Sequence, residues 1–367
     1  MSKLLSRFQG SLVGAVLGDC IGAVYELGGE ITLSEILNTI YSIEASGGTD
    51  NKGKQEEILY SYTDDTAMAR SVAGSLIKHK GFQLKDMVKR FTSEYKSEPD
   101  RGYGGNVTTV FQLLDNPELE DLYEPARKQF DGQGSFGNGG SMRIVPAALF
   151  SYNKDHSYVQ TLTRQITEIT HSHEQAIQGA ILQCLAVHLA LHADNTTPLD
   201  TDLFVDNLKT YMNKLEEEEL KKPKVLTPTK KRTTRSSEKR DKPYCYKLDK
   251  IKEYLNQEKE VTVQELIDVL GNDISALGSV PAAVFSFLRS SKPMTGELKD
   301  RNSFEKTIIY AISLNGDTDT IATMAGAIAG AYYGIEAVPK SWQTCCEGVT
   351  DAIQYANQLE EFVSKSK

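Results

Sequence analysis

The sequence predicts an all-α protein. Strand patterns are few, whereas apolar residues recur at helical spacing in many segments. The composition, 40% hydrophobic and 25% charged, is ordinary for a globular chain that buries a sizeable core. A length of 367 residues allows one large domain or two small ones. Because helix patterns continue on both sides of the one strongly polar segment, we predict a single domain over residues 1–367.

The helical patterns can be followed along the chain in order. The first residues are amphipathic and lead into an apolar helix that ends within residues 18–26. Residues 176–191 are apolar nearly all round, which predicts a helix buried inside a bundle. Residues 320–334 are rich in alanine and glycine, so tight packing is expected to compensate for their poor helix propensity. Two further patterns are Met87, Val88 and Phe91, and Leu162, Ile166 and Ile169.

One segment, residues 216–242, differs from the rest. It consists of an acidic run followed by many lysines and arginines, and it lacks aromatic and most aliphatic residues. Burial cannot offset the entropy lost on ordering such a segment, so we predict a disordered insert. Its basic part has two interpretations, a nuclear-import or nucleic-acid tether and a solvated loop without a specific role. Helix patterns resume from Lys247 onward.

The bulk properties exclude several classes of protein. The net charge of -9 disfavours binding to bare nucleic acid, and no direct sequence-specific binding is expected. The longest apolar stretch, residues 181–191, is too short and too polar to span a membrane. We also expect no secretory signal peptide. Five cysteines, without metal-binding spacing, indicate reduced thiols and an intracellular protein.

Carboxylates gather in two short motifs that each lead directly into a helix pattern. The motifs are residues 62–66 and 316–320. Aspartate and threonine are good N-caps, but one cap suffices for each helix. Because clustered carboxylates repel each other unless a cation lies among them, the two motifs together favour a metal site. Oxygen ligands without nearby cysteine or histidine suit Mg²⁺ or Ca²⁺, and a site shared by two short motifs suits Mg²⁺ better.

Two glycine-rich loops, residues 102–106 and 132–140, precede helix patterns. Backbone without side chains can approach a phosphate closely, although glycine loops are also common connectors. Neither loop matches a P-loop or a dinucleotide-binding fingerprint. Phe130 and Phe136 flank the second loop and are candidates for stacking on a purine or for ordinary core packing.

Three further polar residues are candidates for the site. Glu26 follows the first apolar helix and lies beside two glycines, where a glutamate is often only a solvated residue. His171 and His173 precede the buried helix, and their spacing would direct them apart on a helix, so joint metal binding is not expected.

Six segments, taken together, resemble the ADP-ribosylhydrolases, the family that includes dinitrogenase reductase-activating glycohydrolase. Within that family the chain is most similar to the serine-directed branch. The resemblance covers residues 8–362 apart from the insert. The segments are GDCIGAVYE, YTDDTAMAR, GYGGN, GSFGNGGSMR, THSHEQAIQGAIL and SLNGDTDTIATMAGAIAGAYYG.

The resemblance implies a compact orthogonal helical bundle with two Mg²⁺ ions in a central cleft. It implies that Glu26 is the acid/base residue, on a mobile loop that shields the metals. Some relatives carry tyrosine at the position of Phe136, where phenylalanine keeps the stacking ring but lacks the hydroxyl group. The implied metal ligands are Thr63, Asp64, Asp65, Asp317, Asp319 and Thr320. The implied ADP-ribose contacts are Gly102, Tyr103, Gly104, Gly105, Phe130, Gly134, Ser135, Phe136, Gly137, Asn138 and His171.

The activity that the resemblance implies is Mg²⁺-dependent removal of O-linked ADP-ribose. The implied substrates are proteins ADP-ribosylated on serine, poly(ADP-ribose) and O-acetyl-ADP-ribose, in turnover linked to DNA damage. A monomer without membrane attachment is expected, in nucleus and cytoplasm and also in the mitochondrial matrix. Three alternatives stay open: hydrolysis of arginine-linked ADP-ribose, a non-catalytic binding or structural protein like the related jellyfish lens crystallins, and a phosphohydrolase that releases AMP.

Overall fold

The computed structural model describes residues 1–26, 28–46, 60–222 and 241–365. Regular structure in this part of the chain is helical, which confirms the all-α prediction; only isolated bridges join Tyr60 to Cys346 and Gly137 to Ser275. The first half contains α1 (Lys3–Gly22), α2 (Leu33–Ser46), α3 (Asp64–His79), α4 (Leu84–Ser97), α5 (Gly105–Leu114), α6 (Glu124–Gly132), α7 (Gly139–Met142), α8 (Val145–Phe150) and α9 (His156–Thr167). The second half contains α10 (Glu174–His192), α11 (Thr201–Lys221), α13 (Pro243–Asn256), α14 (Val263–Leu270), α15 (Ala276–Ser290), α16 (Ser303–Ser313), α17 (Thr318–Tyr333), α18 (Lys340–Thr344), α19 (Val349–Lys365) and two short 3₁₀ turns, Gly296–Leu298 and Ile335–Ala337.

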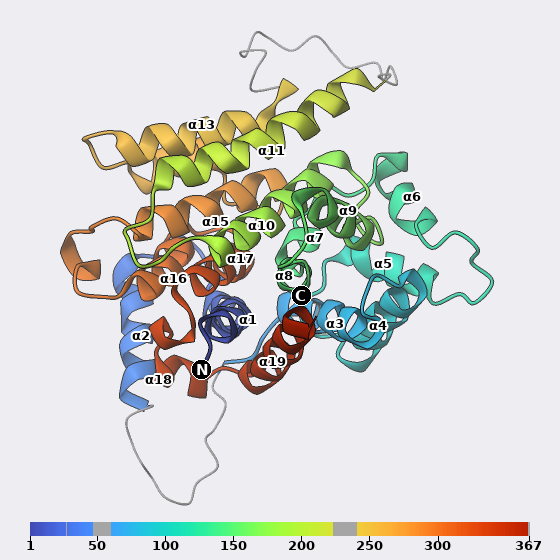
Figure 1. Ribbon diagram of the computed structural model, residues 1–367, viewed down its shortest axis with the longest axis horizontal. Helices are drawn as coiled ribbons and strands as arrows, with labels where there is room; N and C mark the ends of the chain where they lie inside the picture. The colour runs from blue at the N-terminus through green and yellow to red at the C-terminus, as the bar shows by residue number, and fades with distance from the viewer. Residues whose placement is uncertain (27, 47–59, 223–240, 366–367) are drawn as a thin grey trace, which may run out of the picture.

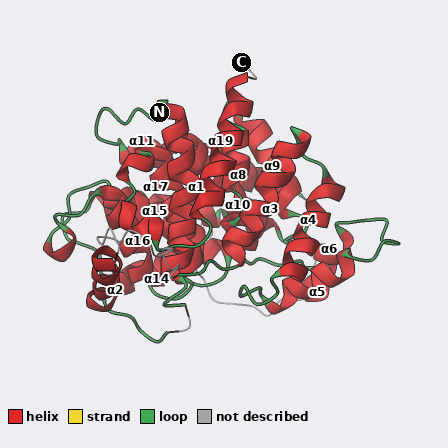
Figure 2. Cartoon of the chain, turned by 90° about the horizontal axis from the view of Figure 1, so that it is seen from below, coloured by secondary structure: helices red, strands yellow, loops and turns green. Residues whose placement is uncertain are grey.

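Helices α1 and α17 form the centre of the bundle and run side by side (Figures 1 and 2). Glycines make this approach possible. A methyl group added at Gly14 would lie 2.3 Å from the carbonyl oxygen of Gly326, and one added at Gly18 would lie 2.2 Å from that of Ala322. The predicted helix rich in alanine and glycine is α17. As expected, it packs closely against another helix, and that partner is α1.

Helix α10 is the predicted buried helix. Nearly all of its side chains are buried, and it packs against α9, α15 and α17. Helices α11 and α13 pair with each other and cover α15 on one side of the molecule (Figure 1, top). Helices α3, α4, α5 and α6 lie on the opposite side of α10 from α16 and α2 (Figure 1). This arrangement brings the N-terminal ends of α3 and α17 together near the end of α1.

The predicted insert begins too early in the sequence. Its first residues belong to the last turns of α11, and Glu216 is buried at 2% exposure. The Glu216 carboxylate accepts hydrogen bonds from the backbone N–H groups of Tyr244 (2.7 Å) and Cys245 (3.1 Å) at the start of α13. The acidic run therefore includes a residue that caps a helix N-terminus, where unpaired N–H groups favour a carboxylate. Residues 223–240 lie outside the described residues, whereas Asp241 and Lys242 at the end of the predicted insert are described.

The described cysteines are all buried and carry free thiols, as the sequence led us to expect. Within the described ranges, no helix combines the length and the apolar character needed to cross a lipid bilayer.

Candidate active site

A cleft of about 410 Å³ opens between the N-terminal ends of α3, α5 and α17. Most of the residues singled out from the sequence line it, including both acidic motifs and both glycine-rich loops. Two do not line it: Thr63 caps α3, and Gly134 packs against Ser172. The lining residues from the predicted set are Glu26, Asp64, Asp65, Gly102, Tyr103, Gly104, Gly105, Phe130, Ser135, Phe136, Gly137, Asn138, His171, Asp317, Asp319 and Thr320.

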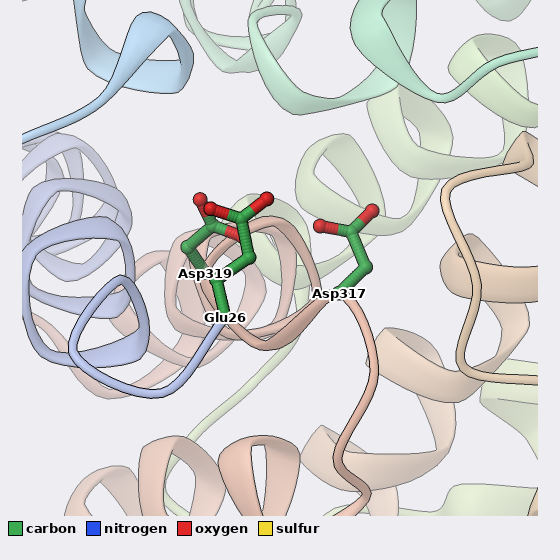
Figure 3. Close-up of side chains that lie close together, drawn as sticks. All are labelled: Glu26, Asp317 and Asp319. Carbon is green, nitrogen blue, oxygen red and sulfur yellow. The ribbon is translucent and has the colours of Figure 1, made fainter. Parts of the chain in front are cut away.

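Three carboxylates converge at one end of the cleft. Oxygen atoms of Glu26, Asp317 and Asp319 all lie within 4.8 Å of one another. Figure 3 shows the three carboxylates pointing to the same side, with Glu26 and Asp319 adjacent and Asp317 beside them. The two aspartates are buried, whereas Glu26 is exposed. This geometry lets a single cation contact all three residues.

The acidic motif at residues 62–66 adds Asp64 and Asp65 to the same site. The Thr320 hydroxyl donates a hydrogen bond to Asp65 (3.3 Å), which joins the start of α17 to the start of α3. The other carboxylate oxygen of Asp65 is buried and has no hydrogen-bond partner among the described residues. A buried carboxylate oxygen without a donor is unfavourable unless a ligand satisfies it.

Asp19 is a residue of the site that sequence reasoning missed. It is fully buried, and its two carboxylate oxygens accept the backbone N–H groups of Thr63 (2.9 Å) and Thr66 (3.0 Å). Through these bonds the end of α1 orients the first turn of α3, on which Asp64 and Asp65 lie. The only signal in the sequence was its place in the segment before Glu26.

A strained turn positions Asp317. Asn315 and Gly316 both have left-handed backbone conformations, with φ of 60° and 71°. The N–H of Asp317 then donates to the carbonyl of Asn272 (2.8 Å). The side-chain amide of Asn138 also donates to the Asp317 carboxylate. Asn138, predicted as an ADP-ribose contact, therefore orients a carboxylate of the acidic cluster in this structure.

The electrostatics of the cluster favour a bound cation. Burial, reinforced by the charge of Asp19, raises the pKa of Asp64 to about 8. Burial and the neighbouring aspartates raise the pKa values of Asp65 and Asp319 well above their usual range. A divalent cation would offset both the desolvation and the mutual repulsion of these groups. Since the available ligands are carboxylate and hydroxyl oxygens, the residues fit Mg²⁺.

Backbone and aromatic groups line the remainder of the cleft. Gly102, with φ of 85°, leads into the loop before α5, and Tyr103 is held edge-on by Tyr95 at 5.1 Å between ring centroids. Phe130 and Phe136 lie 5.9 Å apart with their ring planes 34° from parallel. Their side chains are 44% and 47% exposed, so the alternative interpretation of ordinary core packing is wrong for both residues. Their rings are available to a ligand.

The two histidines have different surroundings. His171 is buried and lines the cleft, close to Gly137 and Gly139. His173 caps α10, and its Nδ1 accepts the N–H of Gln175 (3.2 Å). Arg143, which also lines the cleft, was not predicted as a site residue. Its side chain is 1% exposed, and it lies over the ring of Phe91, 4.6 Å from the centroid.

Comparisons with known proteins agree on one family. The model of the family described as ADP-ribosylglycohydrolase matches residues 1–366. Among curated proteins, the chain is 43% identical over 366 residues to ADP-ribosylhydrolase ARH3 from Mus musculus, covering 100% of this chain and 94% of the relative. It is 44% identical over 366 residues to ADP-ribosylhydrolase ARH3 from Homo sapiens, covering 100% and 96%. A solved structure described as an ADP-ribosylglycohydrolase-related protein complex has a TM-score of 0.64 at 20% identity, with 99% of each chain covered, and supports the fold.

Proposed function

Since the chain belongs to the ADP-ribosylglycohydrolase family and its relatives include ADP-ribosylhydrolases, we propose that it hydrolyses the O-glycosidic bond between ADP-ribose and serine, with two Mg²⁺ ions as cofactor. The observation that carries the proposal is the composition of the cleft. One end is acidic, and the rest offers glycine-rich backbone and exposed aromatic rings. ADP-ribose has the matching groups: a reacting ribose, a diphosphate and an adenine.

The acidic end is proposed to hold the metal ions. Asp64, Asp65, Asp317 and Asp319 supply carboxylates, and Thr63 and Thr320 supply further oxygens. When bound, Mg²⁺ supplies positive charge and Lewis acidity beside the hydroxyl groups of the reacting ribose. The hydrogen bond from Asn138 fixes Asp317, and the buried Asp19 fixes the turn that bears Asp64 and Asp65. The ligands are thereby oriented before the substrate binds.

Glu26 is proposed as the catalytic acid/base. It is the exposed carboxylate of the cluster, so it can reach a substrate that enters from solvent. Burial of part of its side chain, together with the charge of Asp317, raises its pKa. A raised pKa favours the protonated form, which can donate its proton to the departing serine oxygen. The remaining aspartates then stabilise the positive charge that develops at the anomeric carbon. Water attacks this carbon, and Glu26 takes up the proton that the water loses.

The glycine-rich loops and the aromatic pair are proposed to bind the rest of ADP-ribose. We propose that backbone N–H groups of residues 102–105, Ser135 and Phe136 contact the diphosphate. The N–H groups of Gly134, Gly137 and Asn138 already donate within the protein, to Gln129, Ser135 and Ile274. We propose that Phe130 and Phe136 stack on adenine, since both rings are exposed at the cleft. Poly(ADP-ribose) and O-acetyl-ADP-ribose carry an oxygen on the same anomeric carbon, and we include them as substrates. We propose that the protein acts as a monomer on ADP-ribosylated proteins in nucleus, cytoplasm and mitochondrial matrix.

The test compares two matched peptides, one ADP-ribosylated on serine and one on arginine, with product identification by chromatography. The proposal predicts free ADP-ribose from the serine peptide and little from the arginine peptide. Release from the arginine peptide alone would assign the chain to the other specificity. Release of AMP would indicate attack on the diphosphate instead, and no release from either peptide would indicate a non-catalytic protein.

A further inference from the structure

Three polar side chains form a hydrogen-bonded line that ends in the cleft. The Arg143 guanidinium donates to the Thr170 hydroxyl oxygen (2.7 Å) and to the carbonyl of Ile166 (3.1 Å). The Thr170 hydroxyl in turn lies 2.7 Å from Nδ1 of His171. All three side chains are buried, at 1%, 0% and 7% exposure. Sequence reasoning picked out His171 but neither of the residues behind it.

The direction of these bonds follows from the chemistry of each group. A guanidinium can only donate, so Thr170 must accept from Arg143. The Thr170 hydroxyl has one proton of its own, and among the described residues the Nδ1 of His171 is the acceptor within reach. If Thr170 donates there, Nδ1 bears no proton. A neutral imidazole then carries its proton on Nε2.

The Nε2 atom lies at the side of the ring that borders the cleft. A methyl group added at Gly139 would lie 2.9 Å from Nε2 and 2.6 Å from Cε1 of His171, and one added at Gly137 would lie 3.4 Å from Nε2. Glycine at both positions keeps this side of the ring uncovered. Within the described part of the chain, no group accepts a hydrogen bond from Nε2, so this donor is available to a ligand.

We propose that Arg143 and Thr170 are positioning residues that hold His171 as a neutral Nε2–H donor directed into the cleft. On the proposed function, on which this inference rests, the acceptor is an oxygen atom of ADP-ribose. His171 then binds substrate as a fixed donor and does not transfer a proton. Thr170 and Arg143 act through His171 without touching the substrate.

The electrostatics agree with a neutral ring. Burial, and then the charge of Arg143, lowers the pKa of His171 to about 3. Burial lowers the pKa of Arg143 to about 9, with the charge of Asp64 acting in the opposite direction, so Arg143 remains cationic at neutral pH. A cation beside a buried imidazole disfavours a second positive charge.

The first test reads the tautomer directly. Long-range ¹H–¹⁵N NMR correlations on the full chain, without substrate, distinguish a protonated Nε2 from a protonated Nδ1. We expect Nε2 to be protonated and the His171 signals to stay constant from about pH 5 to about pH 8, the range in which an unperturbed histidine titrates. A protonated Nδ1, or titration of His171 within that range, would overturn the proposal. This result does not depend on any enzymatic activity.

The second test uses three threonine variants and calorimetric binding of free ADP-ribose. Thr170→Val removes the hydroxyl, and we expect ADP-ribose affinity to fall about tenfold, as for loss of one well-oriented hydrogen bond. We also expect protonation of Nδ1 to appear in its NMR spectrum. Thr170→Ser keeps the hydroxyl and should restore both properties. Thr167→Val is the matched control, because the buried Thr167 hydroxyl has no partner among the described residues.

The outcomes separate this inference from the proposed function. If all three variants bind ADP-ribose as the wild type does, Thr170 has no positioning role and the inference fails. If the tautomer and the affinities behave as expected but no serine-linked ADP-ribose is released, the inference holds and the proposed activity is wrong.

Discussion

Asp19 is a buried residue whose effect on the site is indirect. Its carboxylate accepts two backbone N–H groups at the start of α3, from Thr63 and Thr66. Asp64 and Asp65 follow in the same turn, so their positions depend on these bonds. Residues of this kind orient the ligands of a metal site, and their replacement typically weakens metal binding.

We predict that Asp19→Asn destabilises the protein and weakens Mg²⁺ binding. Asparagine has one acceptor oxygen, whereas aspartate has two. Its side-chain NH₂ group would therefore face one of the two backbone N–H groups, and neither can accept a hydrogen bond. Leaving a buried donor unpaired costs about 1–3 kcal/mol. Chemical denaturation measures the stability, and calorimetry measures Mg²⁺ affinity. Asp300→Asn, at an exposed position, is the control and should change neither.

The carboxylates of the acidic cluster could be predicted at residue scale, whereas the residues that support them could not. Asp64, Asp65, Asp317 and Asp319 lie in short motifs whose excess of carboxylates is visible in the sequence. Asp19 lies in a helix with no neighbouring carboxylate to draw attention to it. Its partners are 44 and 47 residues away along the chain. Such pairs become visible only when the fold brings them together.

Helices α1 and α17 determine the geometry of the site at the scale of elements. Gly10, Gly14, Gly18 and Gly22 recur at four-residue spacing on α1 and face α17. The Thr318 hydroxyl donates to the carbonyl of Gly22 (2.9 Å), which joins the end of α1 to the start of α17. Asp317 and Asp319 lie at this start, so the separation of the two helices sets their distance from Glu26.

Replacement of Gly18 by alanine tests this dependence. The added methyl group would lie 2.2 Å from the carbonyl oxygen of Ala322, so the helices must separate. Overpacking of this kind costs about 1–3 kcal/mol, and we also expect weaker Mg²⁺ binding because α17 shifts. Gly81→Ala is the matched control, since a methyl group there would meet nothing within 4 Å. Equal thermal stability of the two variants would show that close contact between α1 and α17 is unimportant.

Most elements could be predicted from their periodicity, but their partners could not. The buried helix and the small-residue helix were predicted within two residues of α10 and α17. The sequence also contains the glycine spacing of α1, which indicates a helix that packs closely, but this signal was overlooked. The start of the insert was misplaced because the acidic residues near 216 resemble a solvated run. The partner that buries Glu216 lies beyond the insert.

The whole molecule carries a net charge of -9, and it buries aspartates together in one place. Asp64, which is half-buried beside them, illustrates the consequence for stability. Its pKa is about 8 in the folded chain against an ordinary value of 3.8. Below both pKa values the carboxyl group is protonated in the folded and in the unfolded chain, so it does not change the free energy of unfolding. As pH rises toward about 8, Asp64 ionises in the unfolded chain but stays largely protonated in the folded chain. The free energy of unfolding therefore falls.

We therefore predict that stability of the metal-free protein falls between about pH 4 and about pH 8, and that Mg²⁺ restores it. At about a hundredfold excess over its Kd, a ligand stabilises the fold by about 2.7 kcal/mol. The gain should be larger at about pH 8 than at about pH 5, because the ligands must be ionised. Thermal unfolding with and without Mg²⁺ measures this, and Asp319→Asn should reduce the gain. An equal Mg²⁺ effect at both pH values would argue against a cation among these carboxylates.

The assignment of this cleft as a Mg²⁺-dependent active site is tested by release of free ADP-ribose from a serine-ADP-ribosylated peptide, measured as Mg²⁺ is added to EDTA-treated protein. We expect no release by the wild-type protein without Mg²⁺ and release once Mg²⁺ is added. Glu26→Gln and Asp317→Asn should each reduce the rate at least about a hundredfold, as for loss of a catalytic acid/base or of a metal ligand. Glu30→Gln, an exposed neighbour of Glu26, should behave as the wild type. Release that persists in EDTA, or in both site variants, would contradict the assignment of this cleft as the Mg²⁺-dependent active site.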